Sequence, residues 1–133
     1  MPRYPLSAVH EAARVGRVEG GGPRYLGQLM LLLGEYTKIH EFACAVLLEL
    51  QPQDFIDTER YDNGMEKDAY GVAITDDLQA RFGLEGFVTW YVKFNMDRDD
   101  DGNLVLMASL HGPAHPLKRI GGTMQVKFAR RTS

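Results

Sequence analysis

Apolar side chains in the first part of the chain recur at the spacing of a helix. In segment 38–50 they return every three or four positions, which puts them on one face of an α-helix. That face consists of Ile39, Phe42, Ala43, Val46, Leu47 and Leu50. The pattern predicts a core-facing helix over 38–50, with Thr37 as its N-cap and Pro52 beyond its end.

Two shorter helices are predicted before this one. A first apolar stripe lies ahead of Gly16, a residue that can end a helix in the left-handed conformation. Its members are Leu6, Val9 and Ala13. After a glycine-rich break at 20–23, the apolar stretch 25–33 predicts a second short helix.

Beyond residue 86 the pattern changes from helical spacing to alternation. Segment 87–94 alternates apolar and polar residues, as a half-buried strand does. Its apolar face consists of Val88, Trp90, Val92 and Phe94. An acidic loop at 97–103 leads to a second predicted strand at 104–110, and a third is predicted at 123–128.

Helices first and strands after predict the α+β class, with the N-terminal helices packed on one face of a small antiparallel sheet. A chain of 133 residues that is 44% hydrophobic suits a single domain with one core. We expect residues 1–50 to be mainly helical and 51–86 to be an irregular insertion with one strand-like stretch at 68–74. The antiparallel strands should fall within 87–128, before a tail at 129–133.

If the apolar faces pack on the helices, the opposite face of the sheet is polar. It would display Thr89, Tyr91, Lys93, Ser109, His111, Gln125 and Lys127. Such a face can be polar because water covers it. It can also be a site, because cleaving RNA without a metal requires a base for the 2′-hydroxyl, an acid for the 5′-oxygen and cations for the phosphate. Tyr91, Lys93 and His111 carry groups that can share these tasks.

The formal net charge of −3 is unevenly distributed. Residues 1–34 carry four bases and two acids, residues 35–101 six bases and 16 acids, and residues 102–133 five bases and no acids. The basic ends favour nucleic acid or an acidic partner. The acidic middle would repel phosphate unless the fold turns it away.

We expect a cytoplasmic protein that does not enter membranes and needs no cofactor. The single cysteine, Cys44, cannot form an internal disulfide. The N-terminus lacks a basic segment followed by an apolar signal stretch, and the longest apolar run, 29–33, is far shorter than the roughly 20 residues of a membrane span. Phosphate-binding glycine loops and nucleophile-elbow motifs are absent from the sequence.

Three patterns resemble metal sites, and each has a simpler explanation. The loop 97–102 matches the first six positions of a calcium loop, but Ala108 stands where a bidentate glutamate belongs, which favours a solvated acidic hairpin. Two further pairs have ligand spacing but no second pair beside them. They are His40 with Cys44, and His111 with His115. We assign no metal to the chain.

Several short segments follow one another in an order that is typical of a toxin family. They are 4–9 (Tyr-Pro-Leu-Ser-Ala-Val), 54–55 (Asp-Phe), 67–70 (Lys-Asp-Ala-Tyr), 90–94 (Trp-Tyr-Val-Lys-Phe) and 109–111 (Ser-Leu-His). In this order they resemble the first helix, the Asp-Phe-Tyr-Lys-Ser motif, the Trp-Gln-Asp-Val-Tyr segment, the Leu-Tyr-Leu-Lys strand and the Ser-Phe-Lys close of the MqsR family of bacterial type II toxins.

Members of that family are small ribonucleases with a RelE-like α+β fold, and a cognate antitoxin protein neutralises them. The resemblance implies that Tyr91 is an active-site tyrosine. Lys67 stands at the family's glutamine and His111 at its final lysine, and both can serve as cation, acid or base. The residues expected to be catalytic are Tyr91, His111 and Lys67. The residues expected to bind RNA are Arg60, Lys93, Arg17, Lys118 and Lys127.

The chain departs from the family at Asp57, which occupies the position of the lysine in Asp-Phe-Tyr-Lys-Ser. A carboxylate there would repel phosphate, and Arg60 is the candidate replacement for the cation. The leading hypothesis is a ribosome-independent endoribonuclease that cuts mRNA by 2′-hydroxyl attack and is bound by an antitoxin. The alternative is a non-catalytic relative of phage or mobile-element origin whose acidic middle binds a protein. A third hypothesis, an RNA-binding domain without sequence preference, predicts salt-sensitive RNA affinity without cleavage.

Overall fold

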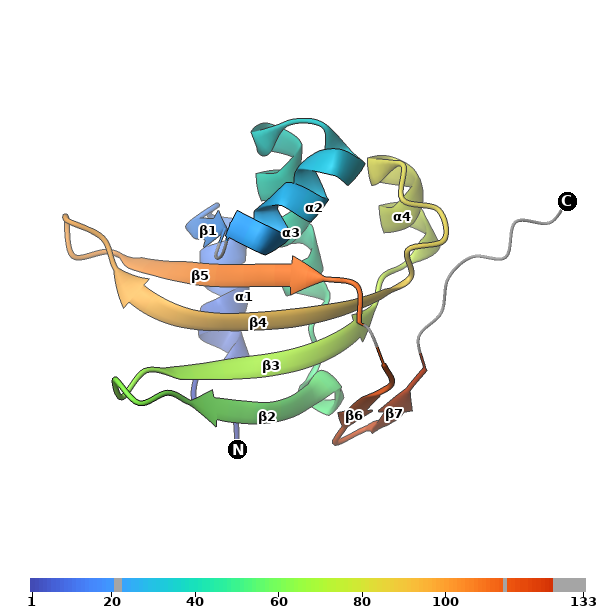
Figure 1. Ribbon diagram of the computed structural model, residues 1–133. Coiled ribbons are helices and arrows are strands. Elements are labelled where there is room, and N and C mark those ends of the chain that lie inside the picture. Colours follow the sequence, from blue (N-terminus) through green and yellow to red (C-terminus); the bar gives the residue numbers. More distant parts are fainter. Residues whose placement is uncertain (21–22, 114, 126–133) are drawn as a thin grey trace, which may run out of the picture.

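The computed structural model describes residues 1–20, 23–113 and 115–125, and this part of the chain folds into helices around a five-stranded sheet (Figure 1). The helices are α1 (Leu6–Arg14), α2 (Pro23–Leu33), α3 (Tyr36–Glu49), the short 3-10 helix η1 (Pro52–Asp54) and α4 (Asp76–Phe82). The strands are β1 (Val18–Gly20), β2 (Phe55–Arg60), β3 (Glu66–Ala73), β4 (Thr89–Arg98), β5 (Leu104–His111), β6 (Leu117–Arg119) and β7 (Gly122–Met124). The predicted α+β class is confirmed.

The strands of the large sheet lie in the order β1-β5-β4-β3-β2. Neighbours are antiparallel except β1, which runs parallel to β5 with Val18 opposite Leu106. The sheet is therefore mixed. Its parallel strand, β1, follows α1 directly and lies at the outer edge beside β5. Three residues are too few to show alternation, which is why the sequence pattern did not predict β1.

The strand predicted at 123–128 does not extend the large sheet. β7 pairs with β6 in a separate two-stranded sheet that packs beside β2 and β3. Val126 and Phe128, which carried most of the alternation in that segment, lie outside the described residues. The expectation that this segment joins the other strands is wrong for 123–124.

Residues 51–86 contain η1, β2, β3 and α4, so the expectation of an irregular insertion is wrong, but the strand-like stretch predicted at 68–74 is confirmed up to Ala73 as part of β3. β2 and β3 form an antiparallel hairpin at the edge of the sheet. In the edge strand β2 only Phe55 is buried, whereas residues 68–72 of β3 are all buried. The polar composition that indicated an insertion is that of an edge hairpin.

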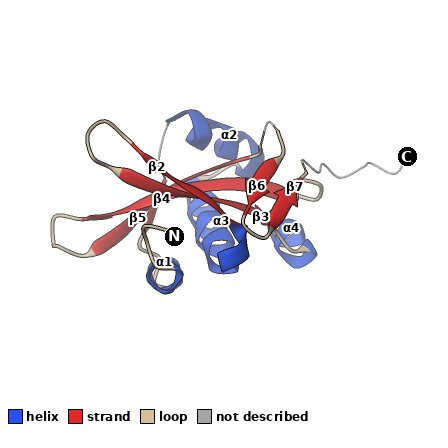
Figure 2. Ribbon diagram, turned by 90° about the horizontal axis from the view of Figure 1, so that it is seen from below, coloured by secondary structure: helices blue, strands red, loops and turns tan. Residues whose placement is uncertain are grey.

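The helices divide between the two sides of the sheet. In Figure 2, α1, α3 and α4 lie on one side, and α2 lies on the other. Among the described residues no helix is long and apolar enough to cross a membrane. Helix α3 begins at Tyr36, so Thr37 lies within it, and Glu35 takes the N-cap position without a side-chain hydrogen bond. The prediction of Thr37 as the cap is therefore wrong by two residues.

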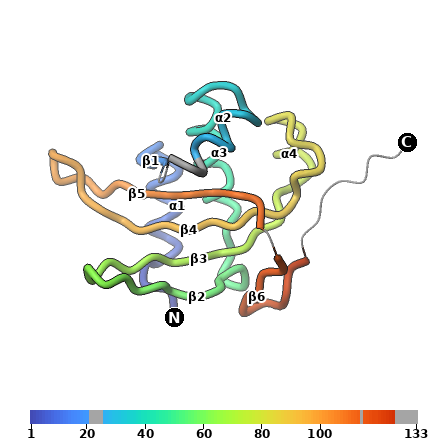
Figure 3. Tube along the Cα trace, in the orientation of Figure 1, coloured from blue at the N-terminus to red at the C-terminus, as the bar shows by residue number. Residues whose placement is uncertain are grey.

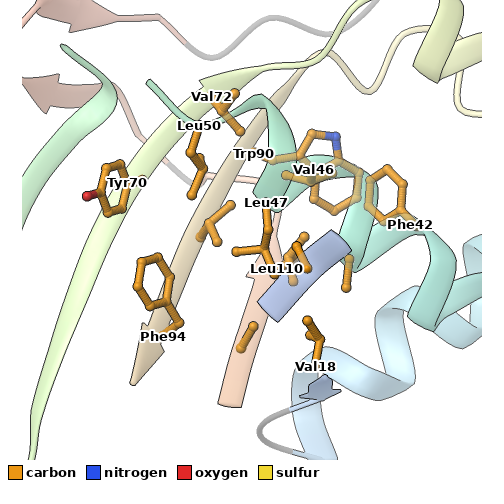
Figure 4. Packing of buried hydrophobic residues seen from close by; sticks show 14 of the residues in the cluster. Val18, Phe42, Val46, Leu47, Leu50, Tyr70, Val72, Trp90, Phe94 and Leu110 are labelled. Carbon is orange, nitrogen blue, oxygen red and sulfur yellow. The ribbon is translucent and has the colours of Figure 1, made fainter. Parts of the chain in front are cut away.

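The core lies between α1, α3, α4 and the sheet, and α2 adds Leu29 and Leu33 to it (Figure 4). All six residues predicted for the inner face of α3 are buried: Ile39, Phe42, Ala43, Val46, Leu47 and Leu50. Phe42 packs edge-on against Trp90 with ring centroids 4.9 Å apart, and Tyr70 stacks on Phe94 at 5.6 Å. These contacts pack α3 against β4 and β3 against β4. The strand residues involved stand at alternate positions, so their side chains point to the same face of the sheet.

A buried carboxylate attaches the N-terminal segment to β3. Figure 3 traces this segment from the N-terminus to α1. The backbone N–H groups of Arg3 and Tyr4 donate to Asp68 at 2.9 and 2.8 Å, and the hydroxyl of Thr58 donates to it at 2.5 Å. Asp68 is fully buried, and these donors satisfy its oxygens. A polar residue on the inner face of β3 therefore holds the chain end against the sheet.

Candidate functional site

The face of the large sheet turned away from α1, α3 and α4 carries a cluster of titratable side chains. We call it the open face. Strand alternation and register bring to it Glu59 of β2, Lys67 of β3, Tyr91 and Lys93 of β4, and His111 of β5. Tyr91 lies opposite His111 across the β4–β5 pair, and Glu59 lies opposite Lys67 across the β2–β3 pair. Residues more than 50 positions apart in the sequence thus share one surface.

An ion pair between Glu59 and Lys93 lies at the centre of the open face. The ammonium of Lys93 donates to Oε2 of Glu59 at 2.7 Å, and the Tyr61 hydroxyl donates to the same oxygen at 2.9 Å. The hydrogen bond from Lys93 holds the pKa of the Glu59 carboxyl below its usual value. Burial acts to lower the pKa of Lys93, but Glu59 and its other partners together raise it above its ordinary value. Both groups are therefore charged at neutral pH.

Tyr91 and His111 form a second contact on the open face. Their rings are 4.9 Å apart at a tilt of 35°, and the Lys93 ammonium lies 5.7 Å from the centre of the Tyr91 ring. Burial raises the pKa of the Tyr91 phenol; the nearby Lys93 opposes this rise, and Glu59 and Asp57 add to it. The phenol is thus neutral at physiological pH and can donate a hydrogen bond. Nδ1 of His111 lies 3.0 Å from the carbonyl oxygen of Gly112.

Lys67 completes the cluster. Its ammonium lies 5.5 Å from the centre of the Tyr61 ring, beside Glu59. Four of the residues singled out from the sequence therefore share the open face: Lys67, Tyr91, Lys93 and His111. The arrangement combines two ammonium groups, a neutral phenol, an imidazole and an ionised carboxylate.

The sequence pattern did not single out Glu59 or Tyr61 as site residues. Both lie in the β2–β3 hairpin, which the polar composition concealed. A signal was present in Asn63-Gly64, a dipeptide typical of tight hairpin turns. Gly64 has a φ of +85°, and its N–H bonds the Tyr61 carbonyl at 2.9 Å. A two-residue turn at Asn63-Gly64 would place Glu59 opposite Asp68, on the wrong face. The observed loop has three residues, 62–64, and this register places Glu59 opposite Lys67.

Asp57 also belongs to the open face. It is exposed and lies opposite Ala69, the residue that faces Lys93 on the next strand. The carboxylate therefore occupies the same row of the sheet as Lys93. The open face thus sets two carboxylates, Asp57 and Glu59, against two ammonium groups.

The other predicted RNA contacts lie elsewhere. Alternation along β2 puts Arg60 on the side of Thr58, away from the open face, where it lies 3.8 Å from Glu66. Arg60 therefore does not replace the missing cation at Asp57. Arg17 lines a groove of about 500 Å³ between α1 and the far end of the β4–β5 hairpin. Lys118 is exposed on β6, and Lys127 lies outside the described residues.

The β6–β7 hairpin covers one end of the open face. A Cβ on Gly71 would lie 2.8 Å from Cδ1 of Leu117, so the hairpin packs directly on the backbone of β3. Arg119 secures it by donating to Oδ1 of Asp54 at 2.8 Å and to the Gly71 carbonyl at 3.2 Å. Burial raises the pKa of Asp54, and the Gln51 N–H and Arg119 counteract that rise. Thr89, predicted to be displayed on this face, is buried instead.

The patterns that resembled metal sites have other roles here. The acidic loop is the turn of the β4–β5 hairpin, as predicted, and Asp99 accepts from the backbone N–H groups of Asp101 and Asn103, both at 2.9 Å. Nε2 of His40 lies 3.0 Å from the Gly16 carbonyl, and Cys44 packs against the core. Burial raises the pKa of the Cys44 thiol. Within the described ranges no three ligand-type side chains come together.

No protein-family model matches this sequence, and no curated protein matches it.

Proposed function

We propose that this protein is an endoribonuclease of the MqsR kind, which cuts mRNA through attack of the ribose 2′-oxygen on the adjacent phosphate. The observation that carries the proposal is the convergence of Tyr91, His111, Lys67 and Lys93 on the open face. These four come from three strands and share no structural task in the core. Their chemistry matches what metal-free RNA cleavage requires.

Each side chain has a role that its surroundings support. Lys67 and Lys93 are cations that can balance charge developing on the phosphate. Tyr91, kept neutral by burial, is a hydrogen-bond donor to a phosphate oxygen. His111, in ring contact with Tyr91, is the proton-transfer group because an imidazole can hold or release a proton near neutral pH.

The wider biology follows from the family resemblance. An MqsR-like toxin has a RelE-like fold, acts on mRNA in the cytoplasm of a bacterium, and is held inactive by a cognate antitoxin. We propose the same for this chain. The α+β class of the fold supports the proposed RelE-like fold. The polar face of the sheet is turned away from α1, α3 and α4, which leaves room there for a substrate.

The decisive experiment compares the parent protein with Tyr91→Phe and His111→Ala on purified mRNA and in an expressing bacterium. The parent should arrest growth and leave fragments ending in 2′,3′-cyclic phosphate. Each substitution should slow cleavage by at least about tenfold, as loss of a transition-state donor or proton-transfer group does. Tyr36→Phe is the matched control for the tyrosine, because Tyr36 is exposed at the start of α3. Activity of Tyr91→Phe equal to the parent's would remove the tyrosine from the mechanism.

One observation favours a second function. Asp57 is exposed on the open face at the position where the family has lysine, and Glu59 already pairs with Lys93. The cations of this face are thereby balanced by carboxylates, which suits a surface for a basic protein segment. Intact RNA and normal growth with the folded parent would support this alternative, and capture of a basic partner that Asp57→Lys releases would establish it.

A further inference from the structure

We propose that Glu59 is the general base of the reaction, the group that removes the 2′-hydroxyl proton. This inference rests on the proposed endoribonuclease function. It also assigns His111 to the opposite task, protonation of the 5′-oxygen that leaves. The assignment of Glu59 as the base does not follow from the motif resemblance, which did not include this residue.

Two hydrogen-bond donors hold the Glu59 carboxylate in place. Lys93 and Tyr61 both bond Oε2, at 2.7 and 2.9 Å. The other oxygen, Oε1, is therefore the one that can accept a proton from a substrate hydroxyl. The side chain is 40% exposed, so a nucleotide lying on the open face can reach it.

The remaining groups of the cluster leave few alternatives for a base. Lys93 is protonated, because its partners raise its pKa. Tyr91 is a neutral phenol, which donates a proton more readily than it accepts one. Among the groups in direct contact with Lys93 or Tyr91, Glu59 and His111 are the two that accept a proton most readily. Cleavage needs one acceptor and one donor.

The two candidates lie on opposite sides of the phosphate-binding groups. Glu59 is on the edge strand β2, and His111 is on β5, with Lys93 and Tyr91 on β4 between them. The contacts are continuous: Glu59 touches Lys93, Lys93 lies over the Tyr91 ring, and that ring meets His111. In an in-line displacement the attacking and leaving oxygens lie on opposite sides of the phosphorus. A phosphate held by Lys93 and Tyr91 would then have an acceptor on one side and a donor on the other.

The step balances without a further reactant. Glu59 takes the 2′-hydroxyl proton as the bond from the 2′-oxygen to phosphorus forms. The bond from phosphorus to the 5′-oxygen breaks, and the imidazolium of His111 gives its proton to that oxygen. The products are a 2′,3′-cyclic phosphate and a 5′-hydroxyl, and exchange with water restores both protonation states.

The pH dependence of cleavage tests the assignment. Glu59 faces Lys93, Tyr61, Lys67 and Tyr91, with Asp57 on its own strand, and His111 faces Tyr91. With a carboxylate base and an imidazolium acid, kcat/KM should fall about tenfold per pH unit above the histidine pKa, ordinarily near 6.5. With His111 as base and Tyr91 as acid, kcat/KM should instead rise to that pKa and stay level to about pH 9. The sign of the slope between pH 6 and 8 separates the two schemes.

Two matched substitutions provide the second test. Glu59→Gln and Asp57→Asn each remove one negative charge from the open face, so both should tighten RNA binding by about twofold to tenfold. Only Glu59→Gln removes the proposed base, and it should lower kcat by about 100-fold or more. Asp57→Asn should cleave at least as fast as the parent. Circular dichroism and thermal melting of both variants establish that they are folded.

The outcomes distinguish this inference from the function on which it rests. Cleavage by the parent, with Glu59→Gln cleaving as fast as Asp57→Asn, would overturn the base assignment and leave the endoribonuclease proposal standing. A parent that never cleaves RNA would overturn both. A slow Glu59→Gln variant, a fast Asp57→Asn variant and a falling slope above the histidine pKa are the results expected.

Discussion

The two faces of the large sheet are built from alternating residues of the same strands, yet they differ in almost every physical property. On β4 the inward side chains Trp90, Val92 and Phe94 are at most 2% exposed and packed against the core. The outward side chains Tyr91 and Lys93 are half-buried and make polar or ring contacts. The inward residues of this strand therefore stabilise the fold, and the outward residues can contact a ligand.

Carboxylates show the same difference. On the covered face Asp68 is fully buried, and two backbone N–H groups and the Thr58 hydroxyl satisfy it. On the open face Glu59 is partly exposed and is held by an ammonium and a phenol. A buried acid must have all its hydrogen bonds supplied by the fold, whereas an exposed one keeps an oxygen for a ligand. The comparison teaches that an acid's surroundings, more than its identity, decide whether it supports the fold or can react.

The largest expected effect comes from removing an inward aromatic side chain. Phe94→Ala should lower the free energy of unfolding by about 3–5 kcal/mol, because it empties a site that Tyr70 and Val92 cannot refill. Urea denaturation followed by circular dichroism measures this. Tyr91→Phe, three positions earlier on the outward face, should change the same quantity by less than about 0.5 kcal/mol. Equal losses in the two variants would show that the faces do not divide stability and chemistry.

The next effect is the loss of the buried carboxylate. Asp68→Asn replaces an acceptor of three hydrogen bonds by a side chain that also carries donors, and should cost about 1.5–3 kcal/mol of unfolding free energy. Thermal melting of Asp68→Asn and Asp57→Asn compares the same substitution on the two faces. Asp57→Asn should melt within a few degrees of the parent, because Asp57 is exposed. A stable Asp68→Asn with its N-terminal segment still protected from protease would contradict this account of the anchor.

The smallest effect separates two cations of the β2–β3 hairpin. Lys67→Ala should weaken RNA binding and reduce the slope of log affinity against log salt by about one, the loss of one phosphate contact. Arg60→Ala should leave that slope unchanged, because Arg60 lies on the other side of the hairpin. Fluorescence titration of a short single-stranded RNA at several salt concentrations measures both. If Arg60→Ala reduced the slope as much as Lys67→Ala, RNA would not be restricted to the open face.

Much of the fold was predictable where the pattern is strong and local. The six inner residues of α3 and the inward positions of β4 followed from periodicity alone. The predicted placement of Tyr91, Lys93 and His111 on one face of the sheet is likewise confirmed, whereas Thr89, predicted beside them, is buried. The strand-like stretch at 68–74 was predicted, but its partner β2 was missed because this edge strand is mostly polar and buries only Phe55.

The sequence by itself determined which side of each long helix and strand faces the core, because that choice depends on spacing within a few residues. Only the tertiary structure decided that Glu59 meets Lys93, 34 residues away, and that Arg60 turns to the other side. Strand order and register are set by pairing between distant segments, and a shift of one residue would exchange the two faces. The candidate site is built from such pairings, so its membership emerged only when the strands were placed side by side.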